Sequence, residues 1–247
     1  MFGFGGLRAK TRNMPGYDGL IYAIGDVHGR LDQLRNILTL IDADRDGTPA
    51  ELILLGDYID RGPHSHKVLD LLVSGAELTD IQLTCLRGNH EQTLLTFLDD
   101  VSIGPEWGKH GGRETLAAYG VAPPRHRTKL DEWERCRAEL SERIPSSHVD
   151  FLNGLPVYAD RDPYFFVHAG IDPDVGLEAQ KPETMMWIRT PFLNFNGKLE
   201  RFVVHGHSAS KKPTRKRCRL GIDTGAYITG TMTAVRIDHK GGRLLQS

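Results

Sequence analysis

Short apolar runs alternate with amphipathic stretches along the first half of the chain. Gly19–Ile24, Glu51–Leu55 and Ile81–Leu86 are apolar runs of strand length, and each is followed by a polar cluster. After the first cluster, apolar side chains recur at helical spacing through residues 30–41, and further helical patterns follow the other two clusters. Because alternation of strand and helix is typical of βαβ units, the pattern predicts a parallel sheet with crossover helices.

The polar clusters recur at a nearly constant interval. Asp26 lies 31 residues before Asp57, and Asp57 lies 32 residues before Asn89. A βαβ unit takes roughly 30 residues or more, so the three clusters occupy equivalent positions in successive units. Ligands of open α/β sheets bind in the crevice at the carboxyl ends of the strands. We therefore expect the three clusters to converge on one site.

The alternation stops over residues 99–150, which contain a Gly-rich turn, a Pro-Pro turn and a charged helical stretch. We predict that this segment is a helical insertion that flanks the site. Strand patterns return after Pro156, and two of these strands end in polar clusters that contain His168 and the pair His205 and His207. The second half of the chain is therefore expected to be mainly β.

A chain of 247 residues is long enough for one well-cored domain. We predict a single α/β domain over residues 18–247, preceded by a flexible Gly-rich leader over residues 1–17. The leader has too many glycines and charges to hold the apolar segment of a signal peptide. The three cysteines have no paired spacing, which predicts neither a disulfide framework nor a cysteine zinc site. The expected location is the reducing cytoplasm.

Composition and charge argue against two classes of partner. No apolar run approaches the ~20 residues that a membrane span needs. The chain has 31 basic and 32 acidic residues, so it has no overall attraction to nucleic acid or to an anionic membrane. We predict neither partner. The basic run over residues 211–219 is either a solvated loop or a surface that steers anionic substrates, and the sequence carries no signal for an oligomeric state.

The polar side chains at the five strand ends form a consistent set of metal ligands. They are Asp26, His28, Asp57, Asn89, His168 and His207. Oxygen and nitrogen donors without a thiolate favour divalent ions such as Mn, Fe, Zn or Mg. Two ions that share a carboxylate stabilise an in-line phosphoryl displacement, and coordination lowers the pKa of bound water to about 7, which supplies the attacking nucleophile. Any single cluster could instead be a turn or a helix cap, but five together favour a two-metal phosphoesterase.

The first cluster also predicts a local geometry. Asp26 and His28 are two residues apart in a segment that we expect to be extended. Side chains two apart in an extended segment point to the same side, so both would face a metal ion.

Three sequence blocks carry a resemblance to a known family. Gly25–Gly29 (GDVHG), Gly56–Gly62 (GDYIDRG) and Gly88–Glu91 (GNHE) resemble the signature blocks of the phosphoprotein phosphatase family of calcineurin-like metallophosphoesterases. The later His-Ala-Gly and Gly-His blocks resemble its two downstream histidine blocks, and the similarity covers most of residues 20–238. The resemblance implies a four-layer α/β fold, in which two packed mixed sheets are flanked by helices, with a dinuclear metal centre at their edge.

The resemblance also implies which ion each ligand binds. The first ion would be held by Asp26, His28 and Asp57. The second ion would share Asp57 and be completed by the three remaining ligands of the set. The choice of His207 over His205 comes from the family pattern alone. Mn²⁺ is the ion that we expect, with Fe, Zn or Mg as alternatives.

Four further residues would act on the phosphate. His90 resembles the general acid of the family, and Asp60 would hold and polarise its imidazole. Protonation matters because serine and threonine alkoxides are poor leaving groups, and general acid catalysis contributes roughly 10²–10⁴-fold. Arg61 and Arg189 resemble the phosphate clamps, since a guanidinium binds two phosphate oxygens at once. The implied activity is removal of phosphate from phosphoserine and phosphothreonine in proteins, as in bacterial serine/threonine protein phosphatases.

Two other functions compete with this one. A symmetrical dinucleoside tetraphosphate hydrolase shares the metal blocks, but such enzymes usually lack an acid at the position of Asp60 and carry Asp at the position of Glu91. An inactive scaffold is disfavoured because every motif position retains a competent residue. Three residues keep open roles: His110 as a substrate contact, His205 as support for a ligand or as a packing residue, and Tyr227 in a short loop near the substrate.

Overall fold

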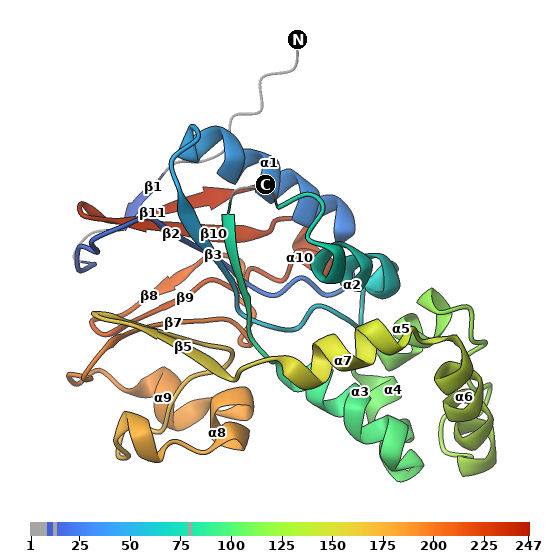
Figure 1. Cartoon of the computed structure of the whole chain (residues 1–247). Helices are drawn as coiled ribbons and strands as arrows, with labels where there is room; N and C mark the ends of the chain where they lie inside the picture. Colours follow the sequence, from blue (N-terminus) through green and yellow to red (C-terminus); the bar gives the residue numbers. More distant parts are fainter. Residues whose placement is uncertain (1–8, 12–13, 79–80) are drawn as a thin grey trace.

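Two mixed β-sheets pack face to face and carry helices on their outer sides (Figure 1). This computed structural model describes residues 9–11, 14–78 and 81–247. Within these residues the first sheet has six strands in the order β1-β11-β10-β2-β3-β4, and the second has five in the order β5-β6-β7-β9-β8. The strands of the first sheet are β1 (Ala9–Thr11), β2 (Ile21–Ile24), β3 (Ala50–Leu54), β4 (Ile81–Cys85), β10 (Thr233–Asp238) and β11 (Gly241–Gln246). Those of the second are β5 (Tyr158–Arg161), β6 (Tyr164–Val167), β7 (Phe202–His205), β8 (Thr214–Arg215) and β9 (Arg219–Gly221).

Parallel pairing occupies the core of each sheet, and in the first sheet it joins the strands for which the βαβ pattern predicts it. β2, β3 and β4 run parallel, as do β6, β7 and β9. The remaining strands are added antiparallel at the sides of these parallel cores. The register pairs Ile24 with Leu54 and Leu54 with Cys85, so the three parallel strands of the first sheet end level with one another. The loops that follow them therefore leave from the same edge.

Alternating side chains fill the spaces between four layers. In β2, Ile21 packs between the two sheets, whereas its neighbour Tyr22 packs in the cluster that includes the helices of the first sheet. In β6, Phe166 joins the core between the sheets, whereas Phe165 faces the helices of the second sheet. Successive side chains of a strand point to opposite faces, so each sheet contributes to two apolar layers. The expected four-layer fold of two packed mixed sheets flanked by helices is confirmed.

Helices cover the outer face of each sheet (Figure 1). The first sheet carries α1 (Leu31–Arg45) and α2 (Ser65–Ser74), whose apolar faces join the same cluster as the outward side chains of β2 and β3. The second sheet carries α8 (Pro182–Trp187) and α9 (Thr190–Asn194) together with the short segment η2 (Leu177–Ala179). The short helix α10 (Ala226–Thr229) lies beside α2 (Figure 1), and its Ala226 joins the cluster of the first sheet and its helices. In the described part of the chain, no helix is both long enough and apolar enough to cross a membrane.

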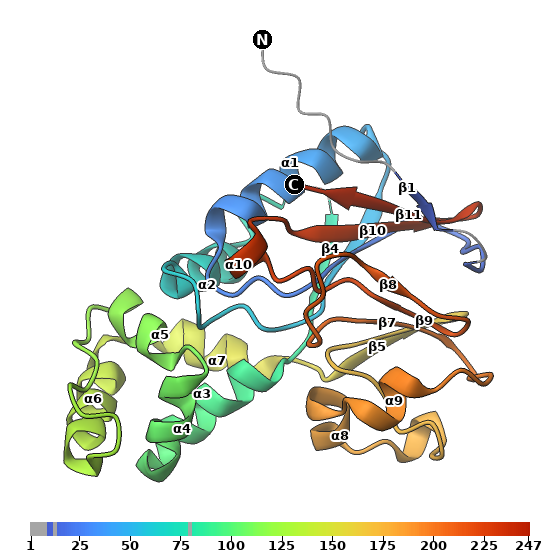
Figure 2. The same ribbon diagram turned by 180° about the vertical axis from the view of Figure 1, so that it is seen from behind.

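A helical wing extends to one side of the sheets, which is also clear from behind (Figure 2). It consists of α3 (Asn89–Asp99), η1 (Val101–Ile103), α4 (Gly104–Lys109), α5 (Gly112–Ala118), α6 (Leu130–Arg143) and α7 (Ser146–Gly154). Its interior is aromatic, because the ring of Trp107 lies 4.6 Å from that of Phe97 and 6.5 Å from that of Trp133. η1 and α4–α6 fall within residues 99–150, where the sequence predicts a helical insertion.

The two ends of the chain differ from the sequence-based prediction. Within the expected flexible leader over residues 1–17, Ala9–Thr11 form strand β1, which pairs with β11. Residues 1–8 and 12–13 of the leader lie outside the described residues. At the other end, no strand was predicted over residues 241–246, which form β11. β11 begins with two glycines, and glycine weakens a strand pattern in sequence; its pairing with β10 and β1 compensates.

Candidate functional site

The loops that follow β2, β3, β4, β6 and β7 meet at one place. The first two are joined by backbone hydrogen bonds, in which the N–H of His28 donates to the carbonyl of Asp57 at 2.8 Å and that of Gly29 to the carbonyl of Tyr58 at 2.8 Å. A Cβ atom on Gly62 would lie 2.0 Å from the carbonyl oxygen of His28, so only glycine fits there. The six side chains that the sequence predicts as metal ligands are all buried at this junction.

Backbone strain is concentrated in these loops. Six described residues other than glycine have a φ angle in the left-handed region, and five of them are residues that sequence analysis assigns to the site. These five are His28 (45°), Asp57 (54°), Asp60 (69°), Arg61 (66°) and His207 (64°). Such conformations cost of order 1–3 kcal/mol each and persist where the surrounding structure enforces them, often at functional sites. The prediction of an extended segment at Asp26 and His28 is wrong, because a turn at His28 directs its ring toward Asp57.

His28 and two carboxylates form the first group of donors. Nε2 of His28 lies 3.8 Å from Oδ2 of Asp26 and 3.5 Å from Oδ2 of Asp57. Nδ1 of the same ring lies 2.8 Å from the carbonyl oxygen of Ile59 and donates its hydrogen there, because a carbonyl can only accept. Nε2 is then an acceptor, and it is buried without a hydrogen-bond partner among the described residues. A buried acceptor that faces two carboxylates fits a cation.

Asn89 and two histidines form the second group around the same aspartate. Oδ1 of Asn89 lies 2.9 Å from Nε2 of His168 and 2.9 Å from Nδ1 of His207, and the two ring nitrogens are 3.2 Å apart. Oδ1 of Asp57 completes the group at 3.4 Å from Nε2 of His168. Nδ1 of His168 donates to the carbonyl of Leu55 at 2.9 Å, which leaves Nε2 to face the group. Four polar atoms that accept in their neutral or anionic forms therefore point at one another, an arrangement that a cation between them would stabilise.

Burial and neighbouring charge set the ionisation of these groups. Burial raises the pKa of Asp26 well above its ordinary value, and the charges of Asp223 and Asp57 raise it further. Burial also acts to raise the pKa of Asp57, but positive charge at His168 outweighs it and holds the pKa well below the ordinary value. Burial lowers the pKa of His168, but Asp57 outweighs it and raises the pKa to about 10. Burial lowers the pKa of His28 and keeps it neutral, the form that binds metals.

The donor set fits two divalent ions with one carboxylate between them. One group of donor atoms within 4.8 Å of one another joins Asp57 to His28 and His90, and another joins it to His168 and His207. Asp57 thus belongs to both groups, as a shared ligand must. Carboxylate, amide and imidazole donors without a thiolate match ions such as Mn, Fe, Zn or Mg.

A fully buried carboxylate orients His90 beside this centre. Nδ1 of His90 donates to Oδ2 of Asp60 at 2.6 Å, which leaves Nε2 at 3.7 Å from Oδ2 of Asp57. Asp60 also accepts hydrogen bonds from Nε1 of Trp107 at 2.9 Å and from the hydroxyl of Thr115 at 2.5 Å. Burial lowers the pKa of His90, but Asp57 and Asp60 outweigh it and raise the pKa above the ordinary value. His90 is therefore held with Nδ1 on Asp60 and Nε2 directed toward the centre, and the raised pKa favours its protonated form.

Glu91 fixes the loop that carries Asp57. Its buried carboxylate accepts the backbone N–H groups of Asp57 at 2.8 Å, Tyr58 at 2.7 Å and Gly88 at 2.9 Å. These bonds tie the loop after β3 to the first turn of α3, on which Asn89 lies. The glutamate of the Asn-His-Glu block thus positions ligands of both donor groups.

A cleft of about 890 Å³ opens beside these residues. Its lining includes Arg61, Asn89, His90, Trp187, Arg189 and His207. Nη2 of Arg61 lies 3.2 Å from Nε2 of His90, and the exposed Arg189 reaches the hydroxyl of Ser208, beside His207, at 3.4 Å. The ring of Trp187 is 48% exposed and lies 6.3 Å from that of His207. The cleft therefore offers two guanidinium groups and one exposed indole to a ligand.

His205 and His207 serve different parts of the fold. His205 is the last residue of β7, where its ring packs 5.1 Å from Phe192 and its Nε2 lies 3.0 Å from Nη1 of Arg219. Burial, together with the charge of Arg219, lowers its pKa to about 3. The left-handed turn at His207 directs that ring to Asn89 instead. Sequence analysis left His205 either as support for a ligand or as a packing residue, and its contacts with Phe192 and Arg219 are those of a packing residue.

Tyr227 and His110 both border the site. The ring of Tyr227, on α10, lies 5.2 Å from that of His28 and 4.7 Å beneath the guanidinium of Arg61. It therefore supports one predicted ligand and one predicted phosphate clamp. His110 is exposed on the cleft wall, where its Nε2 lies 3.0 Å from Oε1 of Glu106.

The basic run over residues 211–219 does not face the cleft. None of its residues is among those that line it. The guanidinium of Arg215 stacks on Phe202 at 4.4 Å, and Arg219 is buried and donates to the carbonyl of Leu193 at 2.7 Å. These arginines pack the second sheet, which does not favour a steering role.

Three residues that shape the site were not assigned from the sequence. Asp223, which raises the pKa of Asp26, follows β9, so it occupies one more polar strand end. For Trp107 the sequence offers only an indirect hint, namely the glycines that follow it. Gly112 is one of them, and a Cβ atom there would lie 2.2 Å from the indole. Thr115 had none, because its contact with Asp60 joins residues that are 55 positions apart.

Comparisons with known proteins identify the family of the chain. The family model described as Calcineurin-like phosphoesterase matches residues 19–226. A bis(5'-nucleosyl)-tetraphosphatase PrpE, asymmetrical, from Anoxybacillus flavithermus is 25% identical over 237 residues, which cover 86% of this chain and 88% of the relative.

Two solved structures show the same fold at lower identity. One, provisionally described as a diadenosine tetraphosphatase, has a TM-score of 0.64 and 20% identity, and the match covers 95% of this chain and 96% of the other. A protein serine/threonine phosphatase from Saccharomyces cerevisiae has a TM-score of 0.53 and 16% identity, with 89% and 72% covered. Both comparisons bear on the fold alone.

Proposed function

The chain belongs to the calcineurin-like phosphoesterase family, and we propose that it is a two-metal hydrolase whose preferred substrate is a dinucleoside tetraphosphate. One observation carries the hydrolase part of this proposal. Six oxygen and nitrogen donors, with Asp57 at their centre, gather beside a cleft that also holds Arg61 and Arg189. A phosphate bound in this cleft would meet positive charge on two sides.

The residues divide the chemistry between them. When bound, two divalent ions, with Mn²⁺ expected, supply an activated water and neutralise charge on the phosphate. We assign the six predicted ligands to these ions, with Asp57 between them. Arg61 and Arg189 bind phosphate oxygens. As water adds to phosphorus and the bond to the leaving oxygen breaks, His90 gives a proton to that oxygen, and Asp60 keeps His90 oriented.

Two observations favour a dinucleotide substrate over the phosphoprotein substrate that Asp60 and Glu91 suggest. The relative described above is named as a bis(5'-nucleosyl)-tetraphosphatase and aligns with most of this chain. The cleft wall also presents the exposed indole of Trp187 close to His207. An exposed aromatic ring beside a phosphate site can stack on a nucleobase.

Replacing Trp187 by Ala tests the nucleobase contact. Stacking of one base contributes about 1–3 kcal/mol, so KM for diadenosine tetraphosphate should rise by about 5- to 150-fold. The kinetic constants for p-nitrophenyl phosphate, which carries no nucleobase, should change little. Trp187→Phe, which keeps an aromatic face, should retain most of the affinity. An equal rise in KM for both substrates in the Ala variant would contradict a stacking role.

A phosphoprotein substrate is the second candidate, supported by the pairing of His90 with Asp60. In this pair Asp60 orients the imidazole beside the centre and, together with Asp57, raises its pKa above the ordinary value. Serine and threonine alkoxides need protonation more than the phosphate leaving group of an anhydride does, because they are far more basic. The presence of the pair therefore suits ester cleavage as well as anhydride cleavage.

The proposed working environment is the cytoplasm, without a nucleic-acid or membrane partner. All three cysteines are buried and unpaired. Disulfides are rare in the reducing cytoplasm, so this state supports the proposal.

The deciding experiment is hydrolysis by metal-stripped protein with and without added Mn²⁺. It would be run in parallel on diadenosine tetraphosphate and on a phosphothreonine peptide, and the nucleotide products would be identified. Metal-dependent cleavage that prefers the dinucleotide is expected, and the products would distinguish symmetrical from asymmetrical cleavage. Preference for the peptide would establish the second candidate, and absence of metal-dependent cleavage of either substrate would contradict the hydrolase proposal.

A further inference from the structure

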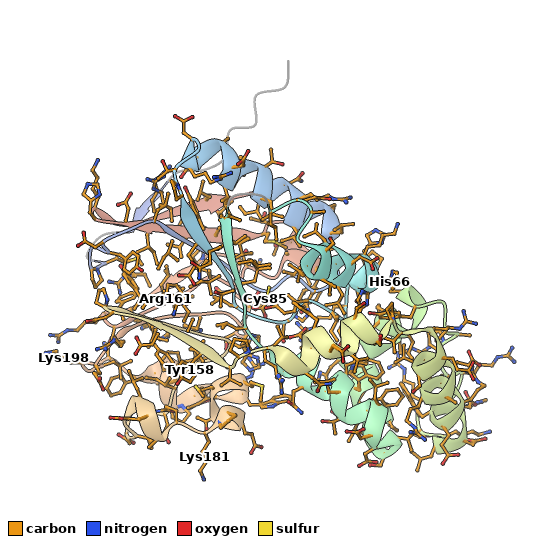
Figure 3. All side chains as sticks on the ribbon, in the orientation of Figure 1. His66, Cys85, Tyr158, Arg161, Lys181 and Lys198 are labelled. Carbon is orange, nitrogen blue, oxygen red and sulfur yellow. The ribbon has the colours of Figure 1, made fainter. Side chains whose placement is uncertain are left out.

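A third group of metal-binding side chains lies outside the site described above. His66 and Asp70 are one turn apart on α2, and His148 reaches them from α7. Nδ1 of His66 lies 3.2 Å from Oδ2 of Asp70, and Nε2 of His148 lies 3.1 Å from Oδ1 of the same carboxylate. One donor atom from each residue lies within 4.8 Å of the other two. Figure 3 labels His66 at the surface where α2 meets the helical wing.

The ring of His148 is held as metal-binding histidines usually are. The side chain is only 2% exposed, and its Nδ1 lies 2.8 Å from the hydroxyl oxygen of Tyr119. A contact of this kind on one ring nitrogen fixes the orientation of the other, so Nε2 is directed at Asp70. No local pattern in the sequence indicates this arrangement, because His148 lies 78 positions from Asp70.

The donor atoms lie close enough to share a small cation. Zinc bonds of 2.0–2.1 Å in a tetrahedron place neighbouring donor atoms roughly 3.3 Å apart, and His66 and His148 approach the two different oxygens of Asp70 at 3.2 and 3.1 Å. Two imidazoles and a carboxylate supply three protein ligands. The side chains of His66 and Asp70 are 36% and 51% exposed, so water can complete the coordination.

We infer that His66, Asp70 and His148 bind a divalent cation of borderline softness, of the Zn²⁺ class, at the junction of α2 and α7. The ion joins the sheet layer to the helical wing. It lies close to the catalytic loop, because Ser65, the residue before His66, accepts the backbone N–H of Asp60 at 3.1 Å. The ion is structural in this inference and takes no part in the proposed hydrolysis.

The test measures the zinc content of the protein rather than its activity. Metal-stripped full-length protein is dialysed against Zn²⁺, and its zinc content per chain is measured for the wild type and for the variant His66→Asn/Asp70→Asn. The variant should hold one zinc ion fewer per chain, and the rise in Tm on addition of Zn²⁺ should be smaller. The same pair of substitutions in an Asp57→Asn background should again remove one ion, which separates this site from the proposed hydrolytic centre.

A matched control comes from a histidine that pairs with a single carboxylate. Nδ1 of His126 lies 2.6 Å from Oε1 of Glu132, with the histidine 62% exposed. His126→Asn should therefore bind as much zinc as the wild type. Equal zinc content in the wild type and the double variant would overturn the inference and leave the cluster as hydrogen bonds to one carboxylate. If the double variant does not fold, the zinc content of the single variant His66→Asn tests the inference in the same way. The side chain of His66 is partly exposed, so its replacement removes little packing.

Discussion

Replacing Asp57 by Asn is expected to lower kcat/KM by about 10³-fold, because metal ions contribute several kcal/mol of transition-state stabilisation and each 1.36 kcal/mol is tenfold in rate. Asp57 is the residue common to both groups of donors. Its Oδ2 faces Nε2 of His28 at 3.5 Å and its Oδ1 faces Nε2 of His168 at 3.4 Å. An amide has similar volume but lacks the negative charge and one of the two oxygens, so it cannot hold two cations.

The measurements are steady-state kinetics and metal content of the same preparations. Asp150→Asn, a change of the same kind at an exposed position on α7, serves as the control and should retain full activity and metal. Circular dichroism would establish that the Asp57 variant remains folded. A folded Asp57→Asn protein with wild-type activity and metal content would exclude Asp57 as the shared ligand.

Replacing His90 by Asn is expected to lower kcat on a phosphothreonine peptide by roughly 10²–10⁴-fold, the usual contribution of general acid catalysis. Asn has no titratable proton to give to the leaving alkoxide. The loss on diadenosine tetraphosphate should be smaller, because a phosphate leaving group needs less protonation. KM should change little for either substrate, since the predicted clamps Arg61 and Arg189 remain in the cleft.

Comparison of the two substrates separates a proton donor from a residue that only maintains the site. His110→Asn is the matched control, because His110 lines the same cleft but contacts Glu106 rather than the donor groups. Asp60→Asn should reproduce part of the loss on the peptide, since it removes the acceptor that orients His90. Equal losses on the ester and the anhydride would argue against proton donation by His90.

The positions of the predicted ligands follow from local sequence patterns. Apolar runs of strand length end directly before Asp26, Asp57 and Asn89, and the parallel register makes those ends level. The glycines beside these residues also have local reasons, since Gly62 allows the backbone of one loop to touch that of another. Strand ends that are adjacent in a parallel sheet must be near one another in space, so periodicity alone predicted where the donors would gather.

Other features depend on contacts between residues far apart in the chain. Trp107 and Thr115 determine how Asp60 holds His90, from distances of 47 and 55 positions. His205 and His207 are equivalent in a strand pattern, and only the left-handed turn at His207 sends one ring to the donors and leaves the other in the core.

The sequence by itself determined the parallel sheet with its crossover helices and the strand ends that carry the donors, because apolar periodicity and glycine blocks act over a few residues, whereas the four-layer arrangement was implied by the family resemblance of the motifs. The tertiary structure alone decided how Trp107 and Thr115 hold Asp60 beside His90, how β11 joins the first sheet, and that Asp70 meets His148. Each of these depends on a side chain or strand whose partner has no fixed spacing in the chain. Such a contact forms only when packing brings the two segments together.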